Sequence, residues 1–84
     1  MVKIRVNVAY FALARDLAGT SEEEIELDNA ANIEQLFSAV LNAHPKLRGI
    51  RDIIRTIVNG RVILEKVELK DKDHVALLPA VGGG

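Results

Sequence analysis

The chain has 84 residues, a length that fits a single domain. Its 11 Lys and Arg residues nearly balance 12 Asp and Glu residues, and the formal net charge of -1 lacks the basic excess that nucleic-acid phosphates select. With 49% hydrophobic and 27% charged residues, the composition lies outside the range of disordered chains, and the absence of cysteine excludes thiol catalysis and thiolate zinc sites.

The first third of the chain predicts two strands joined by a short helix or turn. Apolar and polar residues alternate over residues 2–10, the period of two that places one face of a strand on a core. Residues 11–18 then switch to helix-forming types and stop before Gly19, the residue type favoured just past a helix end. Residues 22–27 alternate again, with acidic side chains on the side that would face water. We expect these two strands to pair with each other.

A long amphipathic helix is predicted next. Its apolar residues recur at helical spacing and form one stripe, made of Ile33, Leu36, Phe37, Val40 and Leu41. Asn29 or Asn32 can cap the start of this helix, and Pro45 cannot continue it. Residues 47–54 are ambiguous between an irregular link and a short helical link.

The remaining residues predict three short strands. Residues 56–58 and 62–64 are rich in β-branched side chains, and the Asn-Gly-Arg at residues 59–61 between them is a strong hairpin signal. A polar turn at residues 71–73 precedes a last strand over residues 75–78. The sequence therefore predicts two more strands in a hairpin and a third at the end.

This order of elements predicts an α+β fold, with a mixed sheet of about five strands and one main helix packed across one face. The β-grasp (ubiquitin-like) arrangement lets the helix stripe and the inward strand residues share one core. We expect one domain over residues 1–81 and a flexible tail over residues 82–84.

The N-terminal segment alternates charged and apolar residues, so it lacks the apolar run of a signal peptide. No stretch approaches the roughly 20 apolar residues that span a membrane. We therefore expect a soluble, cytoplasmic protein without a membrane or nucleic-acid partner.

The tail is the least usual feature of the sequence, because Gly82, Gly83 and Gly84 are half of its six glycines. A segment without Cβ atoms can enter a narrow channel and bring its terminal α-carboxylate to a reacting centre, which makes the carboxylate of Gly84 the candidate reactive group. The same run is equally typical of a frayed end, an appended sequence or a trimmed longer chain. Composition alone leaves these readings open.

Several short motifs together resemble one family over essentially the whole chain. They are Tyr10-Phe11-Ala12, Arg15-Asp16-Leu17, Gly19, Val58-Asn59-Gly60, Leu69-Lys70-Asp71, the run from Asp73 to Pro79, and the glycine end. The combination resembles the MoaD-type small subunits of molybdopterin synthase, which are ubiquitin-like sulfur carriers related to ThiS. Members usually end in Gly-Gly after a small residue, so Gly82 takes the small position, and Ala80 replaces one of two prolines.

The resemblance implies a carrier cycle with the chain as a non-catalytic subunit. An adenylating enzyme of the ubiquitin-activating (E1-like) type uses ATP to join the carboxylate of Gly84 to AMP, and sulfur from a persulfide donor displaces AMP to give a thiocarboxylate. A MoaE-type large subunit then accepts the tail, and the sulfur passes to a cyclic pterin precursor of the molybdenum or tungsten cofactor. The chain itself is expected to bind no cofactor stably and to catalyse nothing alone.

A docking face is expected beside the tail. Strand parity places Phe11 and Leu78 outward, where they could form an apolar patch. The resemblance places partner contacts at Phe11, Arg15, Val62 and Leu78, and we count Pro79 among the expected contact residues as well. Two plainer readings stay open: Phe11 and Leu78 could cap the edge of the core, and Arg15 could be a solvated helix charge.

Other polar residues carry no predicted chemistry. His44 and His74 are far apart in the sequence and lack metal-ligand spacing, so we expect surface histidines and no metal site. The acidic run Glu22–Glu24 fits a solvated strand edge and is assigned no function.

Two further classes of function remain open at this point. Within the family, the chain could carry sulfur for thiamin synthesis or for tRNA thiolation, or act as a small ubiquitin-like modifier joined to lysines through Gly84. In a different class, it could be a ubiquitin-like interaction domain that never reacts. A carrier needs its free terminal carboxylate, whereas a non-reactive domain should tolerate an added residue.

Overall fold

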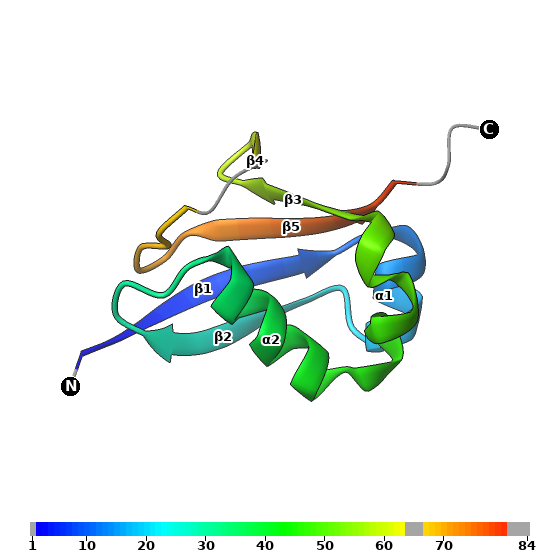
Figure 1. Ribbon diagram of the computed structural model, residues 1–84, viewed down its shortest axis with the longest axis horizontal. Helices are drawn as coiled ribbons and strands as arrows, with labels where there is room; N and C mark the ends of the chain where they lie inside the picture. The colour runs from blue at the N-terminus through cyan, green and yellow to red at the C-terminus, as the bar shows by residue number, and fades with distance from the viewer. Residues whose placement is uncertain (1, 64–66, 81–84) are drawn as a thin grey trace.

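The structure, a computed structural model, describes residues 2–63 and 67–80. A five-stranded sheet carries the long helix across one face, and two shorter helical segments pack together at one end of the sheet (Figure 1). The predicted strand over residues 62–64 ends at a residue outside the described ranges. The expected domain boundary at residue 81 and the three terminal glycines also lie outside them.

The strands are β1 (Lys3–Tyr10), β2 (Glu22–Asp28), β3 (Ile54–Val58), β4 (Arg61–Ile63) and β5 (His74–Pro79). They lie in the order β2-β1-β5-β3-β4. The central pair β1 and β5 is parallel, whereas β2 runs antiparallel to β1 and β3 runs antiparallel to both β5 and β4. The predicted pairing of the first two strands and the predicted mixed sheet are confirmed.

The helical segments are α1 (Ala12–Ala18), α2 (Ile33–Ala43) and the 3-10 helix η1 (Pro45–Ile53). Asn32, and not Asn29, caps α2: the Asn32 Oδ1 accepts the Gln35 N–H at 2.9 Å, and the Gln35 Oε1 accepts the Asn32 N–H at 2.9 Å. The ambiguous link before β3 is helical, and its Leu47 is buried. β3 begins at Ile54, two residues earlier than predicted.

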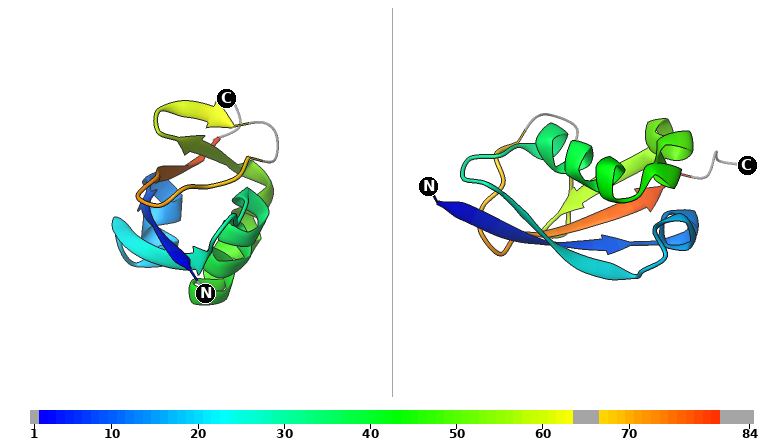
Figure 2. Two further views of the ribbon diagram at one scale, coloured as in Figure 1. Left: turned by 90° about the vertical axis from the view of Figure 1, so that its left-hand side faces the viewer. Right: turned by 90° about the horizontal axis from the view of Figure 1, so that it is seen from below.

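The core lies between α2 and the face of the sheet that α2 covers (Figure 2). Its members from β1, β5 and α2 are Ile4, Val6, Val8, Tyr10, Val75, Leu77, Leu36, Val40 and Leu41. All nine are residues that strand parity and helical spacing place inward. Val2, which the same parity places inward, is 69% exposed because it precedes β1, and Ile33 and Phe37 of the helix stripe are only partly buried against the core. Burying each large side chain contributes roughly 1.5 to 3 kcal/mol, so this shared core supplies the main stabilisation of a chain without disulfides.

The turn before β5 is held by side chains as well as by backbone. The Asp73 carboxylate accepts the Asn59 side-chain N–H at 2.9 Å and the Lys70 backbone N–H at 2.8 Å. The Asn59 side-chain oxygen in turn accepts the His74 backbone N–H at 2.9 Å. Asn59 and Lys72 both adopt left-handed backbone angles, with φ of 50° and 69°. The Asn-Gly hairpin and the polar turn, which are separate in the sequence, therefore form one unit.

We expect Asp73→Ala to lower the free energy of unfolding by about 1 to 3 kcal/mol, because the substitution removes the charged acceptor of two hydrogen bonds, from the Asn59 side chain and from the Lys70 backbone. Urea unfolding at neutral pH measures this loss. Asp52→Ala is the matched control, since Asp52 is exposed and its side chain makes no hydrogen bond or ion pair with a described residue. Equal unfolding midpoints for the two variants would contradict the role given to Asp73.

Candidate docking face and chain end

The outer face, meaning the face of the sheet turned away from α2, carries the candidate site. Strand register sorts its side chains into rows. In one row, Ala9 lies opposite Ala76, Ala76 opposite Ile57, and Ile57 opposite Val62. On the other side of Ala9, the row ends at Glu22 of β2. Four apolar residues thus stand side by side across β1, β5, β3 and β4.

The next row lies at the end of the sheet where β5 finishes. Leu78 is opposite Arg55, and the Phe11 N–H donates to the carbonyl of Leu77 at 3.2 Å, which brings Phe11 beside β5. The backbone of Phe11 is extended, so its side chain follows the buried Tyr10 with the opposite, outward parity. The described chain ends one step further, where the Ala80 N–H donates to the carbonyl of Ile53 at 2.6 Å.

These two rows form what we call the outer apolar patch, consisting of Ala9, Phe11, Ile57, Val62, Ala76 and Leu78. Phe11, Val62 and Leu78 are 45%, 56% and 39% exposed, which is high for large apolar side chains. An exposed patch of this kind marks an interaction surface. It lies at the end of the sheet where the chain continues toward its glycines.

The outer face becomes polar away from that end. Asn7 lies opposite both Glu24 and His74 in the following row. Beyond it, the Arg5 guanidinium lies 3.6 Å from the Glu24 carboxylate and 3.7 Å from the Glu26 carboxylate. Among the described residues, the rows at Asn7 and Arg5 are therefore polar, and the outer apolar patch lies in the chain-end half of the face.

The predicted contact residues divide into two groups. Phe11, Val62 and Leu78 share the outer apolar patch, and Arg15 is exposed on α1 without an ion pair to any described residue. Pro79 differs from the expectation, because its inward parity buries it opposite Ile54 of β3, where its side chain has little surface to offer a partner. Gly82, Gly83 and Gly84 lie outside the described residues.

Sequence reasoning missed four residues of this face: Ala9, Arg55, Ile57 and Ala76. Their outward parity could have been read from the alternation of β1, β3 and β5. Their position next to one another could not, because it depends on which strands are neighbours and in what register.

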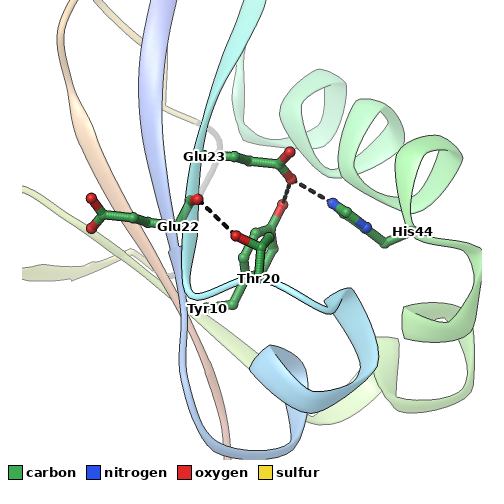
Figure 3. Close-up of polar contacts among 5 residues, drawn as sticks. All are labelled: Tyr10, Thr20, Glu22, Glu23 and His44. Atoms are coloured by element: carbon green, nitrogen blue, oxygen red, sulfur yellow. Dashed lines mark hydrogen bonds and ion pairs between the residues drawn. The ribbon is translucent and has the colours of Figure 1, made fainter.

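A polar cluster connects β1, β2 and the end of α2 (Figure 3). The carboxylate of Glu23 accepts the hydroxyl hydrogen of Tyr10 and also bonds the Nε2 of His44. The Tyr10 and His44 rings meet edge to face with centroids 5.4 Å apart. The expectation of a surface histidine is confirmed for His74 and wrong for His44, which folds in at the end of α2. The acidic run Glu22–Glu24 was likewise expected to be a solvated strand edge, and this is wrong for Glu23, which is partly buried and hydrogen-bonded.

The ionisation of this cluster follows from its contacts. Burial, followed by the hydrogen bond to Glu23, raises the pKa of Tyr10 far above its usual value, so its hydroxyl stays a donor. Partial burial alone would raise the pKa of Glu23, but the hydrogen bonds from Tyr10 and His44 outweigh burial and lower this pKa. Because the folded pKa lies below the unfolded one, ionised Glu23 stabilises the fold at neutral pH, and this stabilisation disappears as the pH falls through the folded pKa.

We therefore expect Glu23→Gln to flatten the acid side of the stability profile. Wild-type protein should lose unfolding free energy as the pH falls below about 4.3, the ordinary Glu pKa, whereas the variant lacks the part of this loss that Glu23 causes. Urea midpoints measured from neutral pH to about pH 3 test this. Glu22→Gln, at the exposed neighbouring position, should keep the wild-type profile, and identical profiles for all three proteins would contradict the assignment.

Residues 2–63 and 67–80 hold neither a candidate membrane span nor a candidate metal site. No helix there is long and apolar enough to cross a membrane. No three side chains of the His, Asp or Glu types gather as a metal site would need.

Comparison with known proteins places the chain in a family. The ThiS family model matches residues 8–84. A molybdopterin synthase sulfur carrier subunit from Chlamydomonas reinhardtii is 34% identical over 83 residues, which cover 96% of this chain and 100% of the relative.

Solved structures agree with the sequence match. A putative molybdopterin converting factor subunit 1 from Pyrococcus furiosus superposes with a TM-score of 0.85 at 37% identity, covering 93% of this chain and 99% of that chain. SAMP1 from Haloferax volcanii superposes with a TM-score of 0.84 at 26% identity, covering 95% and 99%. The β-grasp prediction is thereby confirmed, and the chain belongs to the ThiS family of ubiquitin-like sulfur carriers that its motifs resemble.

Proposed function

We propose that this protein is the sulfur-carrier subunit of a molybdopterin synthase, with sulfur carried on the carboxylate of Gly84. The observation that supports this most directly is the outer apolar patch, which lies at the end of the sheet where β5 leads toward the glycines. The Chlamydomonas relative of that name matches over its whole length. A patch in this place would dock a partner at the point where the tail begins.

The proposed chemistry takes place on the terminal carboxylate. An E1-like adenylating enzyme lets a Gly84 carboxylate oxygen attack the α-phosphorus of ATP, which releases pyrophosphate and forms an acyl adenylate. The terminal sulfur of a persulfide donor then attacks the acyl carbon and releases AMP. Cleavage of the resulting sulfur–sulfur bond by a thiol leaves the thiocarboxylate and a disulfide. Because the sulfur is bound to the terminus, the carrier needs no cysteine, and the sequence has none.

The described residues suit a docking role for this chain and leave catalysis to a partner subunit. The outer face offers apolar contact surface and few ionisable groups near the chain end, which suits docking better than acid–base catalysis. Catalytic side chains would come from a MoaE-type large subunit, in which a tail of glycines can enter a narrow channel. The carrier would then present the sulfur to a cyclic pterin precursor in the cytoplasm.

A second candidate is a small protein modifier, which the structural likeness to SAMP1, the small archaeal modifier protein 1, favours. A modifier uses the same activated carboxylate, but a lysine amine rather than a sulfur atom displaces the activating group. Carriers for thiamin synthesis or tRNA thiolation would share the loading steps and differ only in the acceptor. Activation of the Gly84 carboxylate therefore distinguishes all of these carriers and the modifier from a non-reactive interaction domain.

Intact mass spectrometry tests the proposal. The protein is incubated with its cognate adenylating enzyme, ATP and a persulfide donor, and a second sample lacks ATP. We expect a mass increase equal to one oxygen replaced by one sulfur in the complete mixture alone. No increase in the complete mixture would contradict the carrier function, and a mass increase equal to an attached protein would favour the modifier.

A further inference from the structure

A shallow hollow of about 230 Å³ lies in the middle of the outer face. Ala9 and Ala76 face each other across the parallel pair β1 and β5, and both side chains end at Cβ. Ile57 stands on one side of them and Glu22 on the other, so two short residues lie between longer ones. The volume is below the roughly 300 to 1,000 Å³ of small-molecule sites, which favours one inserted side chain of a partner protein.

The wall formed by Glu22 gives the hollow a negative charge. Glu22 and Glu23 project to opposite sides of β2 (Figure 3), so Glu23 is satisfied by the polar cluster while Glu22 faces outward. Within the described residues, Glu24 and Glu26 share the guanidinium of Arg5, whereas the carboxylate of Glu22 makes no hydrogen bond or ion pair.

The rest of the lining supplies no positive partner for this carboxylate. Asn7 and His74 form the polar side of the hollow, and no described lysine or arginine lines it. The floor is apolar and continuous with the outer apolar patch, whose exposed members flank it. An occupant that satisfies all of these surfaces needs an apolar stem and a cationic end.

We propose that the hollow receives an arginine side chain of the large subunit, with its methylene stem on the Ala9–Ala76 floor and its guanidinium on the Glu22 carboxylate. This inference rests on the proposed function, because it specifies how that partner is recognised. Arginine buries its stem along apolar surface and offers a planar fork that fits a carboxylate bidentately. It is also enriched near the centre of interfaces, where the hollow lies on this face.

Binding to the purified cognate large subunit, measured by calorimetry, tests the charge. Glu22→Gln should weaken binding about tenfold and reduce its dependence on salt, because the guanidinium loses its ionised acceptor. Glu24→Gln is the matched control on the same face and strand, since Glu24 already pairs with Arg5 outside the hollow, and it should bind within about twofold of wild type. Equal affinities for the two variants would overturn the proposal.

A second pair of variants tests occupancy of the hollow. Ala76→Leu fills the hollow and should weaken binding about tenfold or more. Ala43→Leu makes the same change at an exposed residue of α2 and should leave the affinity unchanged. If no side chain enters the hollow, the added apolar area would leave binding unchanged or tighten it, and that result would overturn the proposal. Ala9→Leu fills the same space from β1 and replaces Ala76→Leu if the latter unfolds.

Two readouts complete the test. A water-soluble carbodiimide couples carboxylates to amines but not to guanidinium groups, so a cross-link between Glu22 and a lysine of the large subunit would overturn the choice of arginine. Sulfur loading by intact mass should be the same for all variants, because the hollow acts after loading. Failure of the wild type to load would contradict the proposed function, while the binding results would still decide the hollow.

Discussion

A single alanine added after Gly84 is expected to abolish sulfur loading completely. In the proposed cycle the adenylating enzyme acts on the α-carboxylate of Gly84. The extra residue moves this carboxylate by about 3.3 to 3.6 Å and adds a Cβ atom to a tail that must enter a narrow channel of the enzyme. Intact mass after incubation with the cognate adenylating enzyme, ATP and persulfide donor measures the effect. We expect the unmodified mass only.

The matched control is an alanine added before Met1. The first residues of β1 lie at the end of the sheet opposite to the exit of β5, because the two strands are parallel (Figure 1). This variant should load like the wild type. Equal loading of the C-terminally extended chain would contradict the carrier cycle and favour a non-reactive interaction domain, which has no need of a free terminal carboxylate.

The second large effect is expected for Leu78→Asp, which should weaken binding to the large subunit at least about 30-fold. A charged side chain in the outer apolar patch must be desolvated when a partner covers it, and the few hot-spot residues near the centre of an interface each contribute about 2 kcal/mol or more. The fold should persist, since Leu78 is 39% exposed. Calorimetric titration gives the affinity, and urea unfolding gives the stability.

Two control variants define the limits for this prediction, one that should keep its affinity and one that should unfold. Val2→Asp, on an exposed residue at the opposite end of the molecule, should bind like the wild type. Leu77→Asp, one position along the same strand, should unfold the domain because Leu77 is buried in the core. Wild-type affinity for Leu78→Asp would show that the outer apolar patch does not contact the large subunit.

Local patterns predicted most of the fold because they report which side of an element is buried. The alternation over β1 and the stripe on α2 identify the core, and the parity of β5 correctly separates inward Leu77 from outward Leu78. Parity also places Pro79 inward, although we had counted it among the expected contact residues.

Long-range placement could not be predicted in the same way. The row from Ala9 to Val62 depends on the order β1-β5-β3-β4, in which neighbours are far apart in sequence. The same holds for His44, whose bond to Glu23 depends on how α2 crosses the sheet. No local pattern distinguishes that partly buried contact from a histidine in solvent, so the prediction of a surface residue was wrong.

One measurement tests the central claim most directly: the mass of the same protein sample followed through loading and discharge. After loading with adenylating enzyme, ATP and sulfur donor, the protein is separated and mixed with the large subunit and the cyclic pterin precursor. We predict a gain of one sulfur in place of one oxygen, and then a return to the original mass only when both the large subunit and the precursor are present. A loaded protein that keeps its sulfur in the complete mixture would contradict the role in molybdopterin synthesis.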